Sequence, residues 1–268
     1  MVPELTPPPP GPGPSVFGKK ALSRSDILAL DRLAAAAWAA PEQKQFGGWL
    51  FRHADGITRR ANSAAPFPLQ SGTDLEALIA HTEAFYPARE LPPRIQISPA
   101  AEPEGLDTYL AERGYDVETP VDIMIAKAGG LAGDAAGDIY IHRTAPPGWW
   151  ELYMEGYGRD PRRIVAGAWE TPLFAAAADE NGGIDALGLG VIGGDWLAVF
   201  GMLTRPERRR RGLGAAIIRA LAAFAVDRGV HGIYLQVEDD NPGARSLYEK
   251  LGFRGVYGYH YRTLWTAP

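Results

Sequence analysis

Apolar positions in the C-terminal half of the chain recur at spacings that predict alternating strands and helices. Ile217, Leu221 and Phe224 share one face at helical spacing, which predicts a helix from Leu213 to about Arg228. Short apolar runs bounded by glycine-rich turns are typical of strands. The elements expected here are strands at 139–143, 172–178, 184–192, 196–203, 232–237 and 256–263, helices at 149–157, 213–228 and 242–251, and turns at 180–183 and 193–195.

The strand at 196–203 is expected to alternate its side chains between two faces. One face would carry Trp196, Ala198, Phe200 and Met202, and the other Leu197, Val199 and Leu203. The strand leads directly into a loop that ends at the helix beginning at Leu213.

The N-terminal half shows the same two kinds of pattern. A helix is expected from about Ser25, and Ser23 with Asp26 resembles a capping box. The dipeptide Asp55-Gly56 is a strong hairpin signal and predicts two strands that turn there, between positions 48 and 60. The elements expected after it are a helix around 75–85, a strand at 94–98, a helix ending near 114 and a strand at 121–127.

Small residues and glycines at 128–137 make this stretch the best candidate for a domain boundary. The chain then divides into a flexible proline-rich tail (1–22), an α+β domain (23–127), a linker (128–138) and a second α+β domain (139–268). Hairpins followed by strand–helix–strand units predict the α+β fold class, with a mixed, mostly antiparallel twisted sheet flanked by helices.

Composition narrows the chemistry. The 268 residues include no cysteine, which excludes disulfides, thiolate catalysis and Cys-ligated zinc and favours a cytoplasmic location. No apolar run approaches the roughly 20 residues of a membrane-spanning helix, and the start does not resemble a secretory signal. The net charge of −5 makes the basic cluster at 208–211 a local feature that needs its own explanation.

That cluster lies in a loop, 204–215, which carries Gly212 and Gly214 immediately before the predicted helix. Amides at a helix start lack intrahelical partners, and with the helix dipole they favour an anion. The glycines would let a pyrophosphate approach the backbone, and Arg209 and Arg211 could reach its oxygens; a solvated basic turn is the alternative. The pattern is not a Walker loop, since no Gly-Lys-Ser/Thr follows, and a dinucleotide fingerprint would need a further glycine.

A second motif follows the loop after an intervening helix and strand. The stretch Asn241 to Phe253 fits the pattern N-x-x-A-x-x-x-Y-x-K-x-G-F, and Arg209-x-x-Gly212-x-Gly214 fits R/Q-x-x-G-x-G/A. In this order and separation, the two motifs resemble the GNAT acyltransferase superfamily, and the resemblance covers about residues 139–268.

The resemblance implies a GNAT-like fold and transfer of an acetyl group from acetyl-CoA to an amine. It implies that Tyr248 protonates the departing thiolate. The cosubstrate-binding positions that it implies are Met202, Leu203 and Thr204 on the strand, Arg209, Arg210, Arg211, Gly212, Leu213, Gly214 and Ala215 in the loop, and Asn241.

The general base is less determined. Some relatives carry Leu-Glu-Val in the strand before the asparagine, where this chain has Gln236, which cannot act as a base. Glu238 lies two residues further on, on the same face if the strand continues, and is our candidate. Asp195, Tyr234 and a chain of water molecules stay open as alternatives.

The N-terminal half resembles a degenerate copy of the second. Residues 109–115 are similar to 248–253, but nothing between 48 and 94 matches the arginine–glycine loop, so no second CoA site is expected. An unrelated accessory α+β domain is the alternative. Either could form a wall of the acceptor pocket, together with the aromatic helix at 149–157. The polar residues that could meet a substrate carboxylate or phosphate there, or form surface salt bridges instead, are Arg52, Arg59, Arg60 and Asn62.

These features predict an N-acetyltransferase that acts on a small amine or amino acid-like molecule by direct attack in a ternary complex. A non-catalytic acyl-CoA-binding sensor or interaction protein is the alternative. We expect no metal, because the histidines lack ligand spacing, no nucleic-acid partner and no membrane contact. The sequence leaves monomer and homodimer open.

Overall fold

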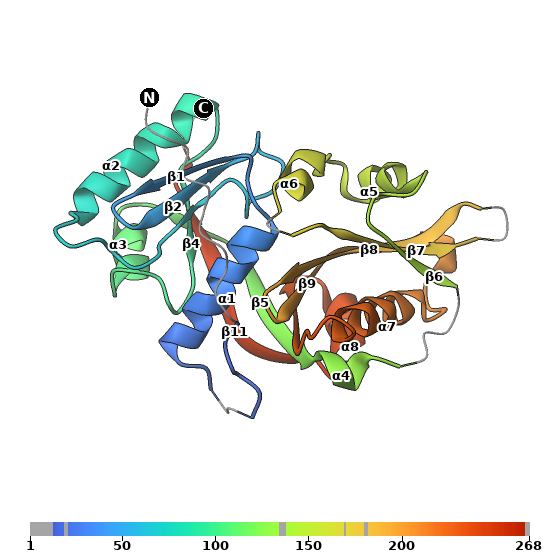
Figure 1. Cartoon of the computed structure of the whole chain (residues 1–268). Helices are drawn as coiled ribbons and strands as arrows, with labels where there is room; N and C mark the ends of the chain where they lie inside the picture. The colour runs from blue at the N-terminus through green and yellow to red at the C-terminus, as the bar shows by residue number, and fades with distance from the viewer. Residues whose placement is uncertain (1–12, 19–20, 134–137, 169, 180–181, 266–268) are drawn as a thin grey trace.

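One sheet of eleven strands runs through the whole molecule in the computed structural model, which describes residues 13–18, 21–133, 138–168, 170–179 and 182–265 (Figure 1). Its strand order is β1-β2-β3-β4-β11-β5-β10-β9-β8-β7-β6. Neighbouring strands are antiparallel except for the pairs β3–β4 and β9–β10, which are parallel. The predicted class, a mixed, mostly antiparallel sheet flanked by helices, is confirmed.

The helices and strands follow the predicted order closely. The helices are α1 (Arg24–Ala37), α2 (Leu75–Phe85), η1 (Pro87–Arg89), α3 (Leu106–Glu112), α4 (Ala128–Leu131), α5 (Trp149–Tyr157), α6 (Arg162–Ala166), η2 (Pro206–Arg208), α7 (Leu213–Val226) and α8 (Pro242–Lys250). The strands are β1 (Glu42–Phe46), β2 (Trp49–His53), β3 (Ala64–Ala65), β4 (Arg94–Ile97), β5 (Asp116–Lys127), β6 (Ile139–His142), β7 (Leu173–Ala178), β8 (Ile184–Gly193), β9 (Trp196–Thr204), β10 (Gly232–Glu238) and β11 (Arg254–Thr263). No helix in the described ranges is long and apolar enough to cross a membrane.

Helices cover both faces of the sheet. Helices α4, α7 and α8 bury apolar side chains against one face of the C-terminal strands, and α1, α5 and α6 do so against the other. Helices α2 and α3 pack on the N-terminal strands, seen to the left of α1 in Figure 1. The predicted capping box at the start of α1 is confirmed, since the side chains of Ser23 and Asp26 each accept the other residue's amide.

The last strand of each half lies next to the last strand of the other. Strand β11 inserts between β4 and β5, and β5 in turn pairs with β10 along Gly232–Glu238. The order β4-β11-β5-β10 therefore places the corresponding strands of the two halves symmetrically about the β5–β11 pair. Each half contributes a strand to the other half's part of the sheet.

The structure corrects one local expectation and adds a helix to another segment. The hairpin turns at Gly47-Gly48, between β1 and β2, rather than at Asp55-Gly56. Asp55 and Gly56 do adopt positive φ angles, but Asn62 Oδ1 accepts the amides of Ala54 and Gly56, so that the chain forms a compact loop instead of a returning strand. The expected linker begins with helix α4, whose Ala128 and Leu131 are buried against α7. Of the turn expected at 180–183, residues 180–181 lie outside the described residues.

Strand β9 does not keep one alternation from end to end. A β-bulge places Gly201 and Met202 opposite Gly188 alone, because Leu203 pairs with Leu187 and Phe200 with Leu189. Beyond the bulge, Met202 packs with the α7 side of the sheet and Leu203 with the α5 side, the reverse of the prediction. Gly201 has φ +55°, and a Cβ there would lie 2.7 Å from the ring of Tyr153.

Candidate active site

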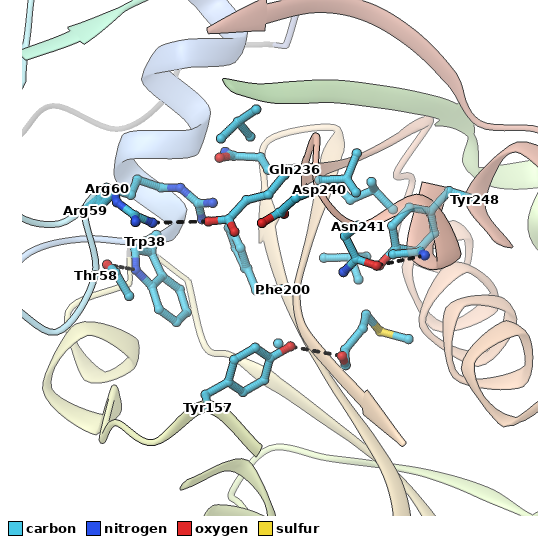
Figure 2. A pocket seen from close by; sticks show the side chains of 18 of the residues that line it. Trp38, Thr58, Arg59, Arg60, Tyr157, Phe200, Gln236, Asp240, Asn241 and Tyr248 are labelled. Carbon is cyan, nitrogen blue, oxygen red and sulfur yellow. Dashed lines mark hydrogen bonds and ion pairs between the residues drawn. The ribbon is translucent and has the colours of Figure 1, made fainter. Parts of the chain in front are cut away.

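A cavity of about 370 Å³ opens where β9 and β10 separate. These parallel strands pair only from Trp196–Gly232 to Val199–Leu235, and the bulge in β9 follows at once. Figure 2 shows Asn241 and Tyr248 on one side of this cavity and Trp38, Thr58, Arg59 and Arg60 on the other. The cavity is therefore built from both halves of the chain.

The edge of β9 that faces the opening is the strand segment expected to bind pantetheine. Met202 lines the cavity, and Leu203 and Thr204 follow it along the strand. The hydroxyl of Tyr157 on α5 donates to the Met202 carbonyl at 2.9 Å (Figure 2). This contact ties the predicted aromatic helix to the opening.

The arginine–glycine loop presents a run of unused backbone donors. Arg210 and Gly212 both have positive φ, +59° and +82°, and Gly212 is the N-cap of α7 without a side-chain cap. Ala216 is the first amide to donate within the helix, to the Gly212 carbonyl. Within the described ranges, no protein acceptor is recorded for the amides of residues 210–215. Such a turn with consecutive free N–H groups at a helix start can bind an anion.

The four arginines of the loop are not equivalent. Arg208 Nε pairs with Asp185 Oδ1 at 3.1 Å, and Arg209 Nε reaches the Thr204 carbonyl at 3.4 Å. Arg210 and Arg211 are exposed and have no carboxylate partner in the described part of the chain. The loop thus keeps positive charge available beside its free amides.

Helix α8 brings its two motif residues to the cavity. Asn241 caps the helix, and its Oδ1 accepts the Ala244 amide at 3.1 Å, which leaves the side-chain NH₂ group for a ligand. Tyr248 is 7% exposed, lines the cavity, and its hydroxyl has no hydrogen-bond partner within the described residues (Figure 2). Burial raises the pKa of Tyr248 to about 12. The phenol is therefore protonated at neutral pH.

Among the candidate bases, Glu238 lines the cavity at the end of β10, and its carboxylate lies 3.6 Å from Arg59. Gln236 also lines it and accepts the Tyr259 hydroxyl at 2.7 Å. Asp195 lies away from the cavity, at the β8–β9 turn, where it accepts the Gly13 amide. Tyr234 is buried and does not line this cavity, and its burial raises its pKa. Of the three side chains considered as the general base, Glu238 lines the cavity, whereas Asp195 and Tyr234 do not.

Two of the four polar residues expected from the N-terminal half line the cavity. Arg59 and Arg60 line the cavity, whereas Arg52 and Asn62 are engaged in buried hydrogen bonds away from it. The sequence did not reveal Trp38 and Thr58, whose side chains meet at 3.1 Å in the wall. The cavity-lining residues that were not anticipated also include Arg159, Asp240, Tyr259 and Tyr261.

Comparison with known proteins agrees with this geometry. Residues 24–262 match the family described as "Probable histone acetyltransferase Rv0428c C-terminal". The chain is similar to the N-acetyltransferase YobR of Bacillus subtilis, with 31% identity over 250 residues that cover 88% of this chain and 98% of YobR. The Rv0428c protein of Mycobacterium tuberculosis is 25% identical over 230 residues, covering 85% of this chain and 70% of that one.

The fold also has solved counterparts. A GCN5-related N-acetyltransferase from Kribbella flavida superimposes with a TM-score of 0.65 over 93% of this chain and 98% of that chain, at 16% identity. Since the family match spans most of the chain, it includes both halves of the sheet and both sides of the cavity. The chain therefore belongs to the Rv0428c C-terminal acetyltransferase family and is a GNAT N-acyltransferase.

Proposed function

We propose that this protein transfers the acetyl group of acetyl-CoA to the amine of a small, amino acid-like molecule, by direct attack in a ternary complex. The observation that carries the proposal is the single cavity that contains both the opening between β9 and β10 and the unpartnered Tyr248 hydroxyl. A GNAT reaction needs these two features together: a strand edge to align the thioester, and a proton donor for its sulfur.

The free amides of residues 210–215 would hold the pyrophosphate of acetyl-CoA, with Arg209, Arg210 and Arg211 adding charge. The edge of β9 from Met202 to Thr204 would pair with the pantetheine arm, and the Asn241 NH₂ group would donate to it. The Met202 carbonyl has a second lone pair, so that it can keep its Tyr157 contact.

The remaining residues account for the proton movements. Glu238 would take a proton from the substrate ammonium, directly or through water, so that the free amine attacks the acetyl carbon. The N–C bond forms and the C–S bond breaks, with Tyr248 donating its proton to the developing thiolate. The second proton leaves the nitrogen once the N–C bond has formed and passes through water in the cavity to the Tyr248 phenolate, and Glu238 gives its proton to solvent. Each ammonium that is acetylated thus releases one proton overall.

We further propose that residues 23–127 are a GNAT-like copy without its own CoA site, and that residues 139–268 carry catalysis. In support, β3–β4 and β9–β10 are both parallel pairs, and each is followed by a helix and a long antiparallel strand. Nothing in the N-terminal half corresponds to the loop at 204–215.

The test is release of free thiol from acetyl-CoA in the presence of a panel of amines, with the amine-free reaction as control. We expect thiol release that depends on an amine, together with the acetylated product by mass spectrometry. Saturable binding of acetyl-CoA without thiol release from any amine would favour the alternative, an acyl-CoA sensor.

A further inference from the structure

Arg59 and Arg60 lie at the end of the cavity opposite Tyr248 (Figure 2), and Arg159 also lines the cavity. Arg52 is buried just outside it and donates to the Ser63 carbonyl, the Ser63 hydroxyl and Gln96 Oε1 at 2.8–3.0 Å. Arg159 donates to the carbonyls of Ile57 and Tyr157 at 2.8 and 3.2 Å. These two side chains have structural partners.

Arg59 and Arg60 are neighbours in sequence but differ in their partners. Arg59 Nε lies 3.0 Å from Glu118, and its NH1 lies 3.6 Å from Glu238. Arg60 has no carboxylate within ion-pair distance in the described part of the chain, and its buried Nε has no hydrogen-bond partner there. Arg59 is thus paired with two carboxylates, whereas Arg60 is paired with none in the described part of the chain.

The surroundings of Arg60 are aromatic. The Phe200 ring lies 5.4 Å from the guanidinium carbon, and the tyrosines at 234 and 259 adjoin the group. Of these, Tyr259 can accept a hydrogen bond from Arg60, because its own hydroxyl proton is donated to Gln236. Tyr259 is a neutral acceptor, so it leaves the guanidinium charge without a counter-charge and its other N–H groups available on the cavity side.

Arg60 is partly buried, and its charge is held among rings without a carboxylate partner, a setting that favours an anion. The group lines the cavity, on the side away from the proposed acetyl-CoA residues Asn241 and Tyr248 (Figure 2). This is the part of the cavity that acetyl-CoA would leave to the acceptor. A bound anion would supply the counter-charge that the protein omits.

We propose that Arg60 binds a carboxylate of the acceptor, so that the preferred substrates are amines that carry a carboxylate, as α-amino acids do. The inference rests on the proposed acetyltransferase function. The planar guanidinium fork matches a carboxylate in a bidentate pair. Glu238, in the same cavity, suits the ammonium end of such a molecule.

The experiment compares matched acceptors: the common L-amino acids, their α-carboxamides and lysine-containing peptides, assayed by thiol release and product mass. We expect kcat/KM for an amino acid to exceed that for its carboxamide at least about tenfold, the usual worth of a charge-assisted hydrogen bond. Arg60→Gln should remove this preference by lowering kcat/KM only for the carboxylates, and Arg60→Lys should restore part of it.

Arg163→Gln is the matched control, because Arg163 is an exposed surface arginine paired with Asp55, outside the cavity. It should leave the preference unchanged. Thiol release that is equal for amino acids, carboxamides and peptides, or a preference retained in Arg60→Gln, would overturn this inference alone. Absence of thiol release from every acceptor would instead overturn the proposed function and this inference with it.

Discussion

The carboxylate of Asp31 provides a quantitative test of the packing that joins the two halves. Asp31 lies on α1 and is 9% exposed. Its two oxygens accept the hydroxyls of Ser98, after β4, at 2.6 Å and of Tyr257, on β11, at 2.7 Å. Burial raises the pKa of Asp31 to about 6, because the hydrogen bonds from Ser98 and Tyr257 and the charge of Arg52 offset only part of the desolvation.

This shift fixes the sign of a pH effect on stability. The pKa in the folded state lies above the ordinary value of 3.8, so the folded protein holds more protons than the unfolded chain between these values. The stabilisation is fully present below pH 3.8 and is lost as the pH rises through 6. The complete shift corresponds to about 3 kcal/mol, of which about 1.3 kcal/mol is lost between pH 5 and pH 7.

The perturbation is Asp31→Asn, which cannot ionise but can accept one hydroxyl and donate to the other. Urea unfolding at pH 5 and pH 7 gives the free energy of unfolding for each protein. From pH 5 to pH 7, we expect the free energy of unfolding of the variant to rise by about 1.3 kcal/mol relative to that of the wild type. Asp160→Asn is the control: the pKa of exposed Asp160 is lowered by its hydrogen bond to Arg162, so its difference from wild type should stay flat in this range. A flat difference for Asp31→Asn as well would refute the reasoning.

Three further predictions concern the candidate site. Gly214→Glu should weaken acetyl-CoA binding at least about tenfold in a calorimetric titration, because the new carboxylate would repel the pyrophosphate at the start of α7. Gly214→Ala should bind acetyl-CoA normally, because its Cβ would meet only the end of the Leu247 side chain, at 3.2 Å. Tyr248→Phe should reduce kcat about 100-fold with little change in acetyl-CoA affinity, and an unchanged kcat would exclude the tyrosine as proton donor. Glu238→Gln should slow turnover at pH 7 by roughly 10-fold or more and recover as rising pH supplies free amine; a deficit that is constant with pH would count against its role as base.

Local chemistry made much of this structure predictable. The capping box at Ser23 and Asp26 acts within one helical turn, and the helix at 213 begins where Gly212 permits a positive φ. The motif residues Asn241 and Tyr248 share one helix face, so the sequence alone placed both toward one site. In each case the deciding contacts lie close together in the chain.

Long-range contacts explain what could not be predicted. The sequence order of strand, helix and strand is the same whether β11 stays within its own half or crosses to the other, so the exchange leaves no local signal. The turn signal at Asp55-Gly56 was real, but the Asn62 side chain decided the path that followed. The bulge at Gly201 reversed the faces of Met202 and Leu203. A glycine permits such a kink, but its presence in the sequence does not predict one. The cavity wall from the N-terminal half followed from these pairings.

The insertion of β11 between β4 and β5 also bears on how the two halves can move. Many enzymes built from two lobes admit substrate by swinging the lobes apart about a hinge. Here such a motion would break the hydrogen bonds that join β11 to β4 and β5 in one continuous sheet. We therefore expect the distance from Arg60 to Tyr248 to stay nearly constant through turnover. Cleavage of the chain at 131–133 would give two fragments, each with strands whose hydrogen-bonding partners belong to the other fragment. Acceptor choice would then depend on fit to a rigid gap, rather than on closure around whatever has entered.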